Sequence, residues 1–276
     1  MQNELEMTES EIKELYVEQR KIHNLTNLHF LKAHNGLRNQ KLHVTLGSPS
    51  AGKSTLRSSI IADFIKCNAK KKIYLWLSEE SEKDYKTDLS NNPALIKLME
   101  SRVMVTSEQD MADELDVDAG ASQIIEQVLQ SNCDLFIFDN VTTSTFYDDQ
   151  HVSVQNKFLT DFKSALRYIK CPVLFFAHTG KQIGSNHPKL IEHTDIRGSA
   201  KLTNIAEYFY ILQPFSVGNH INTSLRIAKS RGHSIKNRYY ALEYDSSLRY
   251  YHADKIIGFD HLNELFKEQD RLGKKL

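Results

Sequence analysis

The sequence predicts an α/β fold: a mostly parallel central sheet flanked by helices, with antiparallel strands added at the C-terminal end. Short, nearly continuous apolar segments alternate with helical segments up to about residue 205. A run of small residues ending in Gly-Lys-Ser connects one of these apolar segments to the helix that follows it. After residue 205, aromatic and β-branched segments follow one another across short gaps. Strands alternating with helices are typical of a parallel sheet, whereas closely spaced strands favour antiparallel pairing.

The expected strands of the parallel sheet are short segments rich in β-branched or aromatic residues, as is typical of strands buried on both faces. They cover residues 42–46, 73–77, 103–106, 134–139 and 173–177. The helices expected between them are Ser54–Asn68, Pro93–Glu100, Ala119–Ser131 and Val154–Ile169.

The two ends of the chain carry additional elements. Residues 8–24 begin with Thr8 or Ser10 as a helix N-cap and acidic residues in the first turn, which predicts a helix. The expected antiparallel strands are the segments EYFYIL, SLRIAK, RYYALEY and LRYYHA, and FDHLNELFKEQDRLGKK is expected to close the chain as a polar helix.

Composition excludes several classes of protein. Lys plus Arg and Asp plus Glu number 35 each, so the net charge is zero and does not by itself indicate nucleic-acid binding. No apolar run is long enough to span a membrane, and the N-terminus is too acidic and polar for a signal peptide. The cysteines Cys67, Cys133 and Cys171 are far apart in the sequence, which argues against a disulfide framework or structural zinc. We therefore expect a cytoplasmic protein without a membrane partner.

A phosphate-binding loop is predicted between the first expected strand of the sheet and the following helix. The pattern G-x-x-x-x-G-K-[ST] is matched by Gly47, Ser48, Pro49, Ser50, Ala51, Gly52, Lys53 and Ser54. Such a loop curls so that backbone N–H groups and the helix N-terminus face phosphate oxygens. Lys53 is expected to reach the β- and γ-phosphates of ATP, Ser54 to bind Mg²⁺, and Thr55 to complete the nucleotide site. A glycine-rich turn that contains lysine by chance is the less favoured alternative.

Carboxylates follow two other expected strands. Asp139 ends a buried apolar segment and is predicted to be the second Mg²⁺ ligand, although an Asp in this position is often only a turn former. Glu79 and Glu80 follow the segment YLWL at the edge of the sheet where ligands bind. One of them is predicted to position the attacking water, while the other lies in the solvated loop.

A set of segments resembles one family. The stretch FLKAHNGLRNQKLHVTLGSPSAGKSTL is similar to the segment leading into the phosphate-binding loop of RecA-type ATPases. It resembles the DnaB-like replicative helicases in particular, and also the smaller plasmid-encoded hexameric helicases of the RepA type. YLWLSEES is similar to their second-strand motif, in which a Ser is followed two positions later by the catalytic Glu, and this spacing favours Glu80 over Glu79. The resemblance spans roughly residues 25 to 250.

The same resemblance implies roles for residues later in the chain. FFAHTGK resembles the strand that ends in a polar γ-phosphate sensor, which implies His178 in that role with Lys181 nearby. DIRGSAKLTNIAEYFYIL is similar to the family's Arg-Gly-Ser segment. LRIAKSRG resembles the Lys-x-Arg hairpin that reaches the ATP of the next subunit, which implies catalytic roles in trans for Lys229 and Arg231.

The resemblance implies a RecA-like P-loop ATPase domain over residues 26–276 and a homo-oligomer, expected to be a hexamer. An N-terminal helix within residues 1–25 either docks on a neighbouring subunit or lies on its own domain. Single-stranded DNA is expected to contact loops 140–157 and 178–197, but the first of these carries Asp148 and Asp149 and is poor in cations. The expected function is a plasmid- or phage-like DNA helicase. A recombination or repair ATPase and a nucleotide-dependent assembly module remain alternatives.

Overall fold

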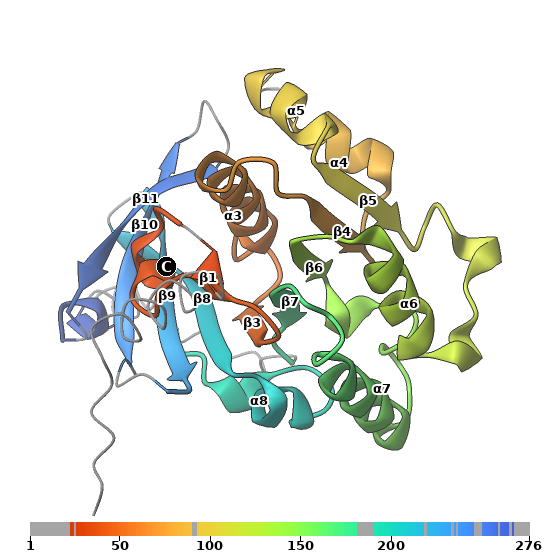
Figure 1. The fold of residues 1–276 in the computed structure, drawn as a ribbon. Coiled ribbons are helices and arrows are strands. Elements are labelled where there is room, and N and C mark those ends of the chain that lie inside the picture. The colour runs from red at the N-terminus through yellow and green to blue at the C-terminus, as the bar shows by residue number, and fades with distance from the viewer. Residues whose placement is uncertain are drawn as a thin grey trace, which may run out of the picture.

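A nine-stranded sheet forms the centre of the computed structural model (Figure 1), which describes residues 23–24, 26–89, 93–180, 190–217, 220–232, 235, 237–245, 250–258, 260–264 and 267. The strand order is β11-β10-β9-β8-β3-β7-β6-β4-β5. The parallel part contains β3 (Leu42–Gly47), β4 (Ile73–Leu77), β5 (Val103–Ser107), β6 (Leu135–Asp139), β7 (Val173–His178) and β8 (Tyr208–Val217). The antiparallel part continues from β8 through β9 (His220–Ser230), β10 (Arg238–Asp245) and β11 (Tyr250–Ile257). The predicted α/β class, with a mostly parallel sheet and antiparallel strands at its C-terminal end, is confirmed.

Helices cover both faces of the parallel strands because both faces are apolar. Along β4, Leu75 and Leu77 pack into one core and Tyr74 and Trp76 into the other, as the alternation of side chains in a strand requires. The first core contains α2 (His29–Lys32), α3 (Lys53–Cys67), α4 (Glu82–Leu89) and α5 (Pro93–Glu100). The second contains α6 (Ala121–Ser131), α7 (Val152–Ala165) and α8 (Lys201–Ile205), which lie together on the lower side of Figure 1.

Several predicted helix boundaries were wrong by a few residues. The helix expected from Ala119 begins at Ala121, because Val117–Ala119 forms a separate 3-10 turn capped by the Asp116 side chain. The helix expected at 154–169 starts and ends earlier, at Val152–Ala165, with His151 accepting a hydrogen bond from the Ser153 amide at its N-cap. Helix α4 was not predicted, because its polar sequence has little apolar periodicity.

The N-terminal prediction is wrong at its end. His23–Asn24 forms the short strand β1, which pairs antiparallel with β2 (Leu37–Arg38), so a helix cannot extend to residue 24. The remainder of the predicted helix at 8–24 lies outside the described residues. At the other end, residues 260–264 and 267 are helical, and the rest of the expected closing helix also lies outside them. No helix in the described ranges has the length and apolarity needed to cross a membrane.

Candidate functional site

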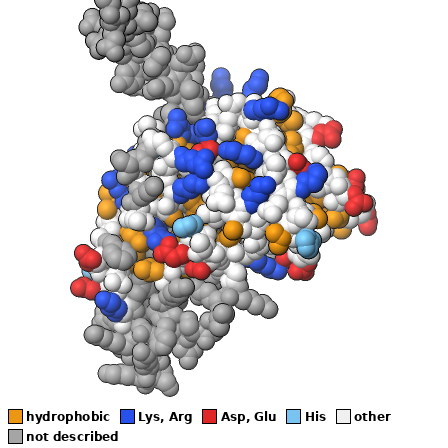
Figure 2. Space-filling view, turned by 90° about the horizontal axis from the view of Figure 1, so that it is seen from below, with side chains coloured by type: hydrophobic (Ala, Val, Ile, Leu, Met, Phe, Trp, Pro, Cys, Tyr) orange, Lys and Arg blue, Asp and Glu red, His pale blue; other side chains and the backbone are white. Residues whose placement is uncertain are grey.

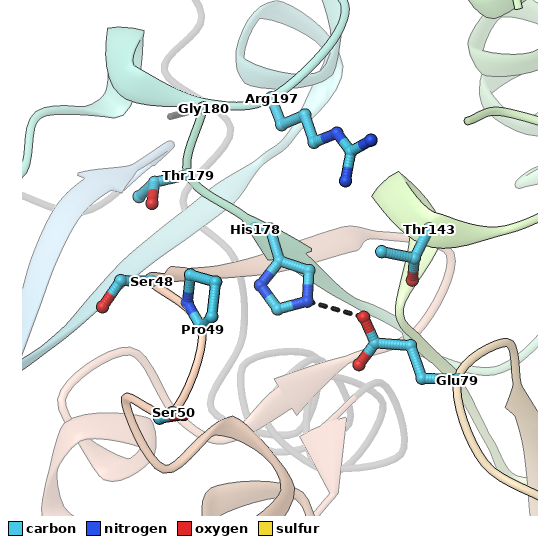
Figure 3. A pocket seen from close by; sticks show the side chains of 9 residues that line it. All are labelled: Ser48, Pro49, Ser50, Glu79, Thr143, His178, Thr179, Gly180 and Arg197. Atoms are coloured by element: carbon cyan, nitrogen blue, oxygen red, sulfur yellow. Dashed lines mark hydrogen bonds and ion pairs between the residues drawn. The ribbon is translucent and has the colours of Figure 1, made fainter. Parts of the chain in front are cut away.

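The carboxyl ends of four neighbouring strands bring the sequence motifs together. In the sheet, β7 lies between β3 and β6, and β4 follows β6. The loop after β3, Glu79 after β4, Asp139 at the end of β6 and His178 at the end of β7 therefore meet at one edge, as parallel strands with crossover connections require. A cavity of about 930 Å³ opens there (Figure 3), lined by Ser48, Pro49, Ser50, Glu79, Thr143, His178, Thr179, Gly180 and Arg197.

The loop of residues 47–54 has the conformation that its glycines permit. Gly52 has a φ of 90°, in the left-handed region, and is the N-cap of α3. A Cβ at Gly52 would also lie 2.5 Å from the Tyr251 hydroxyl oxygen. At Gly47, a Cβ would lie 3.2 Å from the Leu212 carbonyl oxygen. Gly52 is therefore required by its conformation and its packing, whereas a side chain at Gly47 would need a small shift of its neighbours. The loop ends at a helix N-terminus that favours an anion.

Lys53 is buried beneath this loop. Its Nζ donates hydrogen bonds to the carbonyl oxygens of Gly47 (3.2 Å) and Ser48 (2.9 Å) and to Nδ1 of His178 (2.8 Å). Burial lowers the pKa of Lys53 to about 8, although Asp139 and Glu79 favour its charged form. The ammonium is thus held behind His178, which lines the cavity, with all its donors directed at oxygen or nitrogen acceptors.

His178 connects Lys53 to Glu79. An ammonium group can only donate, so Nδ1 of His178 must accept from Lys53, and the ring proton is then on Nε2. Nε2 lies 2.6 Å from Oε1 of Glu79 and donates to it, as the dashed line in Figure 3 shows. This hydrogen bond lowers the pKa of Glu79 against the effect of burial, and Thr143 and Lys53 act in the same direction. Glu79 is therefore held ionised inside the cavity.

Glu80, which the family spacing favoured as the catalytic base, has a different environment. Its Oε1 lies 2.6 Å from Nη1 of Arg57 on α3, and it does not line the cavity. Adjacent side chains at a strand end point in opposite directions, so only one of the two glutamates can face the cavity. The geometry favours Glu79, and the sequence missed this because the spacing alone did not show which side chain turns inward.

Asp139 and Ser54 supply the oxygen atoms expected for Mg²⁺. Asp139 is buried, with Oδ2 2.6 Å from Nη1 of Arg57. Arg57 is three positions after Ser54 on α3, on the same helix face, and the Asp139 carboxylate also acts electrostatically on Lys53 in the first turn of that helix. A carboxylate and a hydroxyl are hard oxygen donors of the kind that Mg²⁺ prefers, so the residues present fit this ion.

A second cavity, of about 660 Å³, adjoins the other side of the loop. Its walls come from the loop and from β8 to β11, and its lining residues are Ser50, Ala51, Gly52, Thr55, Pro214, Asn222, Thr223, Ala241, Leu242, Glu243, Tyr244 and Tyr251. Tyr244 is 52% exposed and its ring lies edge-on to Tyr251, with centroids 5.9 Å apart. No sequence signal distinguishes Tyr244 from the other strand tyrosines.

Lys229 and Arg231 lie at the opposite end of the sheet from the loop. Lys229 pairs with Phe209 at the start of β8, and Tyr208 is level with His43 at the start of β3. At roughly 3.3 Å per residue, this end of β3 is about 13 Å from Gly47. Lys229 Nζ donates to the carbonyl oxygens of Thr203 (2.8 Å) and Asn204 (3.2 Å), and the Arg231 guanidinium to that of Asn204 (3.0 Å).

These two cations belong to a basic surface. Lys163 lies 2.9 Å and Arg231 3.6 Å from carboxylate oxygens of Glu207, and burial and Arg231 lower the pKa of Lys229. Figure 2 shows Lys and Arg side chains gathered on the face seen from below, the side of α7 and α8 in Figure 1. Neither Lys229 nor Arg231 lines the cavity beside His178.

Of the two loops expected to contact DNA, residues 140–157 are described throughout, and residues 178–197 are described at 178–180 and 190–197. In the first, Asp148 forms an ion pair with Arg197 of the second, 2.7 Å apart. Lys157, the only cation of residues 140–157, lies in helix α7 and pairs with Asp161 at 2.7 Å. Lys181 and Lys189 lie outside the described residues. Arg197, by contrast, lines the first cavity, a position that the sequence did not indicate.

Comparison with known proteins leaves the site to be interpreted from its own geometry. No protein-family model matches the chain, and no match was found among curated proteins.

Proposed function

We propose that the chain is a RecA-like P-loop ATPase that hydrolyses Mg-ATP between identical subunits of a ring and uses this reaction to move on or unwind DNA. The observation that carries the ATPase proposal is the hydrogen-bonded series from Lys53 through His178 to Glu79 beside the loop at 47–54. It joins the Lys53 cation to His178 and to an ionised carboxylate, and the last two line one cavity.

Phosphate binding follows from the loop. The backbone N–H groups at the start of α3 and the Lys53 ammonium face the same end of β3, so a triphosphate placed there meets both. A phosphate oxygen is a stronger acceptor for Lys53 than the neutral Nδ1 of His178, because it carries charge. We expect the γ-phosphate to replace this contact, which frees Nδ1 of His178.

Water activation is assigned to Glu79. Its carboxylate is ionised, lies in the cavity and is already oriented by Nε2 of His178. A carboxylate in this position can accept a hydrogen bond from water and direct its oxygen at the γ-phosphorus. Binding of the γ-phosphate would then change the hydrogen bond at Nδ1 of His178, and the effect would reach Glu79 through the hydrogen bond from Nε2.

Mg²⁺ would be held by the Ser54 hydroxyl and the Asp139 carboxylate, and when bound it neutralises charge on the β- and γ-phosphates. The second cavity is the place for the nucleotide base. It adjoins Gly52 and Thr55 and presents the exposed ring of Tyr244, on which a base can stack.

The proposal of a ring of subunits is based on the positions of Lys229 and Arg231. They lie at the end of the sheet away from the loop at 47–54 of their own chain, so a role in hydrolysis would be played at the site of another subunit. Repeating a head-to-tail interface of this kind produces a closed ring when the successive rotations bring the last subunit back into contact with the first. Arg231, whose side chain is 54% exposed, would stabilise charge on the transferred phosphoryl group of the neighbour.

One assay tests the proposal. The purified chain should hydrolyse ATP with Mg²⁺, and single-stranded DNA should increase the rate. Hydrolysis without a DNA effect would favour the assembly module, and DNA stimulation without strand displacement would favour a recombination or repair ATPase. A protein that neither binds nor hydrolyses ATP would contradict the proposed function.

A further inference from the structure

A buried arginine sits between the two carboxylates next to the proposed metal site. Arg57 is 3% exposed, and its Nη1 lies 2.6 Å from both Oε1 of Glu80 and Oδ2 of Asp139. The guanidinium carbon lies 4.9 Å from the centre of the Tyr85 ring of α4, within the range of a cation–π contact. One nitrogen atom thus connects α3, the end of β6 and the residue that follows Glu79.

The charges explain why these groups stay together. Burial alone would lower the pKa of Arg57, yet Asp139 and Glu80 outweigh it and raise the pKa above its ordinary value. Removing one partner of such a cluster leaves a buried charge without compensation, which is strongly destabilising. The side chain of Glu80 is 23% exposed and that of Asp139 only 6%. Asp139 therefore depends on Arg57 more than Glu80 does.

We propose that Arg57 is a positioning residue that gives the two adjacent glutamates different roles and orients Asp139 for the metal. By holding Glu80 against α3, it fixes the backbone after β4 so that Glu79 is the carboxylate that faces the cavity. By binding Oδ2 of Asp139, it leaves the other carboxylate oxygen, Oδ1, to be directed at the Ser54 end of α3. This inference rests on the proposed nucleotide site and deepens it.

The position of Arg57 in the sequence supports a dedicated role. It lies within the segment LRSSII, whose neighbours Leu56, Ile60 and Ile61 are buried in the core. A cation on the core-facing side of a helix is costly unless it is paired. The side chain contacts both carboxylates through one nitrogen, so a lysine ammonium at this position can make the same pair of contacts.

The test uses a charge-balanced pair of substitutions. Arg57→Met with Glu80→Gln removes one cation and one anion, so the summed charge of the cluster is unchanged, while Asp139 loses the contact that orients it. Arg57→Lys is the conservative variant. Lys86→Met with Glu82→Gln is the matched control, because it removes an exposed ion pair of 2.6 Å on α4, away from Asp139. Thermal unfolding establishes that each variant is folded.

The readouts are Mn²⁺ affinity in the presence of a non-hydrolysable ATP analogue, followed by electron paramagnetic resonance, and the separate values of kcat and KM. The Arg57→Met and Glu80→Gln double variant should lose about tenfold or more in Mn²⁺ affinity and in kcat, with little change in KM, as for other residues that orient a metal ligand. Arg57→Lys should recover most of both losses, and the control pair should behave as the wild type.

Two results would overturn the inference. A folded double variant with wild-type Mn²⁺ affinity and kcat would mean that Arg57 only balances charge in the core. If the double variant does not fold, Arg57→Lys gives the test instead. A folded Arg57→Lys protein that loses about tenfold or more in Mn²⁺ affinity and kcat would rule out positioning by a shared cation. A wild-type protein that binds no nucleotide would instead refute the proposed function, and the inference would fall with it.

Discussion

At the scale of single residues, the proposed phosphate binding requires that the side chain of Lys53 is charged. Its pKa is lowered to about 8 by burial, so the free protein loses this charge at a pH at which an exposed lysine keeps it. A bound phosphate stabilises the ammonium and raises its pKa again. Binding and protonation of Lys53 are therefore linked.

This linkage predicts how nucleotide affinity depends on pH. Because the pKa is about 8 in the free protein and higher in the complex, affinity for Mg-free ADP should be fully present below pH 8. Above that pH it should fall by at most about tenfold per pH unit. Calorimetric titrations between about pH 7 and about pH 9.5 measure the slope. Lys53→Arg is the control, since a guanidinium stays charged and its profile should be flat; a flat profile for the wild type would contradict the assignment.

The residues of the site were predictable from sequence only where a motif also fixes the backbone. The loop at 47–54 and Asp139 lie where strand–helix alternation placed them, because consecutive parallel strands end at one edge. The choice between Glu79 and Glu80 was not predictable, since it depends on Arg57, a contact between residues 23 positions apart in the chain. Sequence spacing carries no information on which of two adjacent side chains finds a buried partner.

At the scale of elements, the order of the strands brings two cysteines together that are far apart in the sequence. Cys133 precedes β6 and Cys171 precedes β7, and these strands are neighbours. The two sulfur atoms lie 3.7 Å apart. The hydrogen bond from Cys171 lowers the pKa of Cys133, which favours the reactive thiolate. The sequence, which separates them by 38 positions, gave no indication of this contact.

This contact predicts a disulfide that tests the strand order. Hydrogen peroxide should oxidise Cys133 and Cys171 to a disulfide, with loss of both thiol hydrogens and reduction of the peroxide to water. The cross-link should raise the free energy of unfolding by up to about 4 kcal/mol in the chain-entropy account. Mass spectrometry of the digested protein identifies the linked peptides, and Cys67→Ser is the control that should not alter them. A disulfide containing Cys67 instead would contradict the adjacency of β6 and β7.

Element boundaries also show where sequence reasoning stops. The boundaries of the buried strands were predicted to within a residue or two, because a short, continuous apolar segment in an α/β domain usually forms a buried strand. Helix α4 was missed because only Tyr85 among its described side chains is buried, so its polar surface hides the helical period. Its role in the structure, to place that ring under Arg57, depends on tertiary packing.

At the scale of the whole molecule, the basic surface around Glu207 is separated from the loop at 47–54 of the same chain. Lys163, Lys229 and Arg231 surround that carboxylate at the amino end of the parallel strands. The two cavities beside the loop at 47–54 lie at the carboxyl end. The proposed head-to-tail assembly would use these two different surfaces of one chain, and each site would be completed by the next subunit.

Mixed assemblies test this arrangement. Arg231→Ala should bind ATP but hydrolyse it about three to five orders of magnitude more slowly if the arginine acts on the neighbour's phosphate. Lys53→Ala should not bind nucleotide, yet it retains Arg231. Mixing the two inactive proteins should restore part of the ATPase activity, because some interfaces then combine an intact loop with an intact arginine. Arg167→Ala, which removes an arginine that stacks on Tyr168 outside the site, is the control. A fully active Arg231→Ala protein would refute the role in trans.

The central claim is that Glu79, oriented by His178 and Lys53, positions the water that attacks ATP. The most direct measurement is the steady-state rate of ATP hydrolysis by Glu79→Gln beside Glu80→Gln, with binding of a non-hydrolysable analogue measured on both. Glu79→Gln should keep nucleotide affinity and lose about two to four orders of magnitude in kcat, whereas the loss in Glu80→Gln should be far smaller. Wild-type hydrolysis by Glu79→Gln together with an inactive Glu80→Gln would contradict the account.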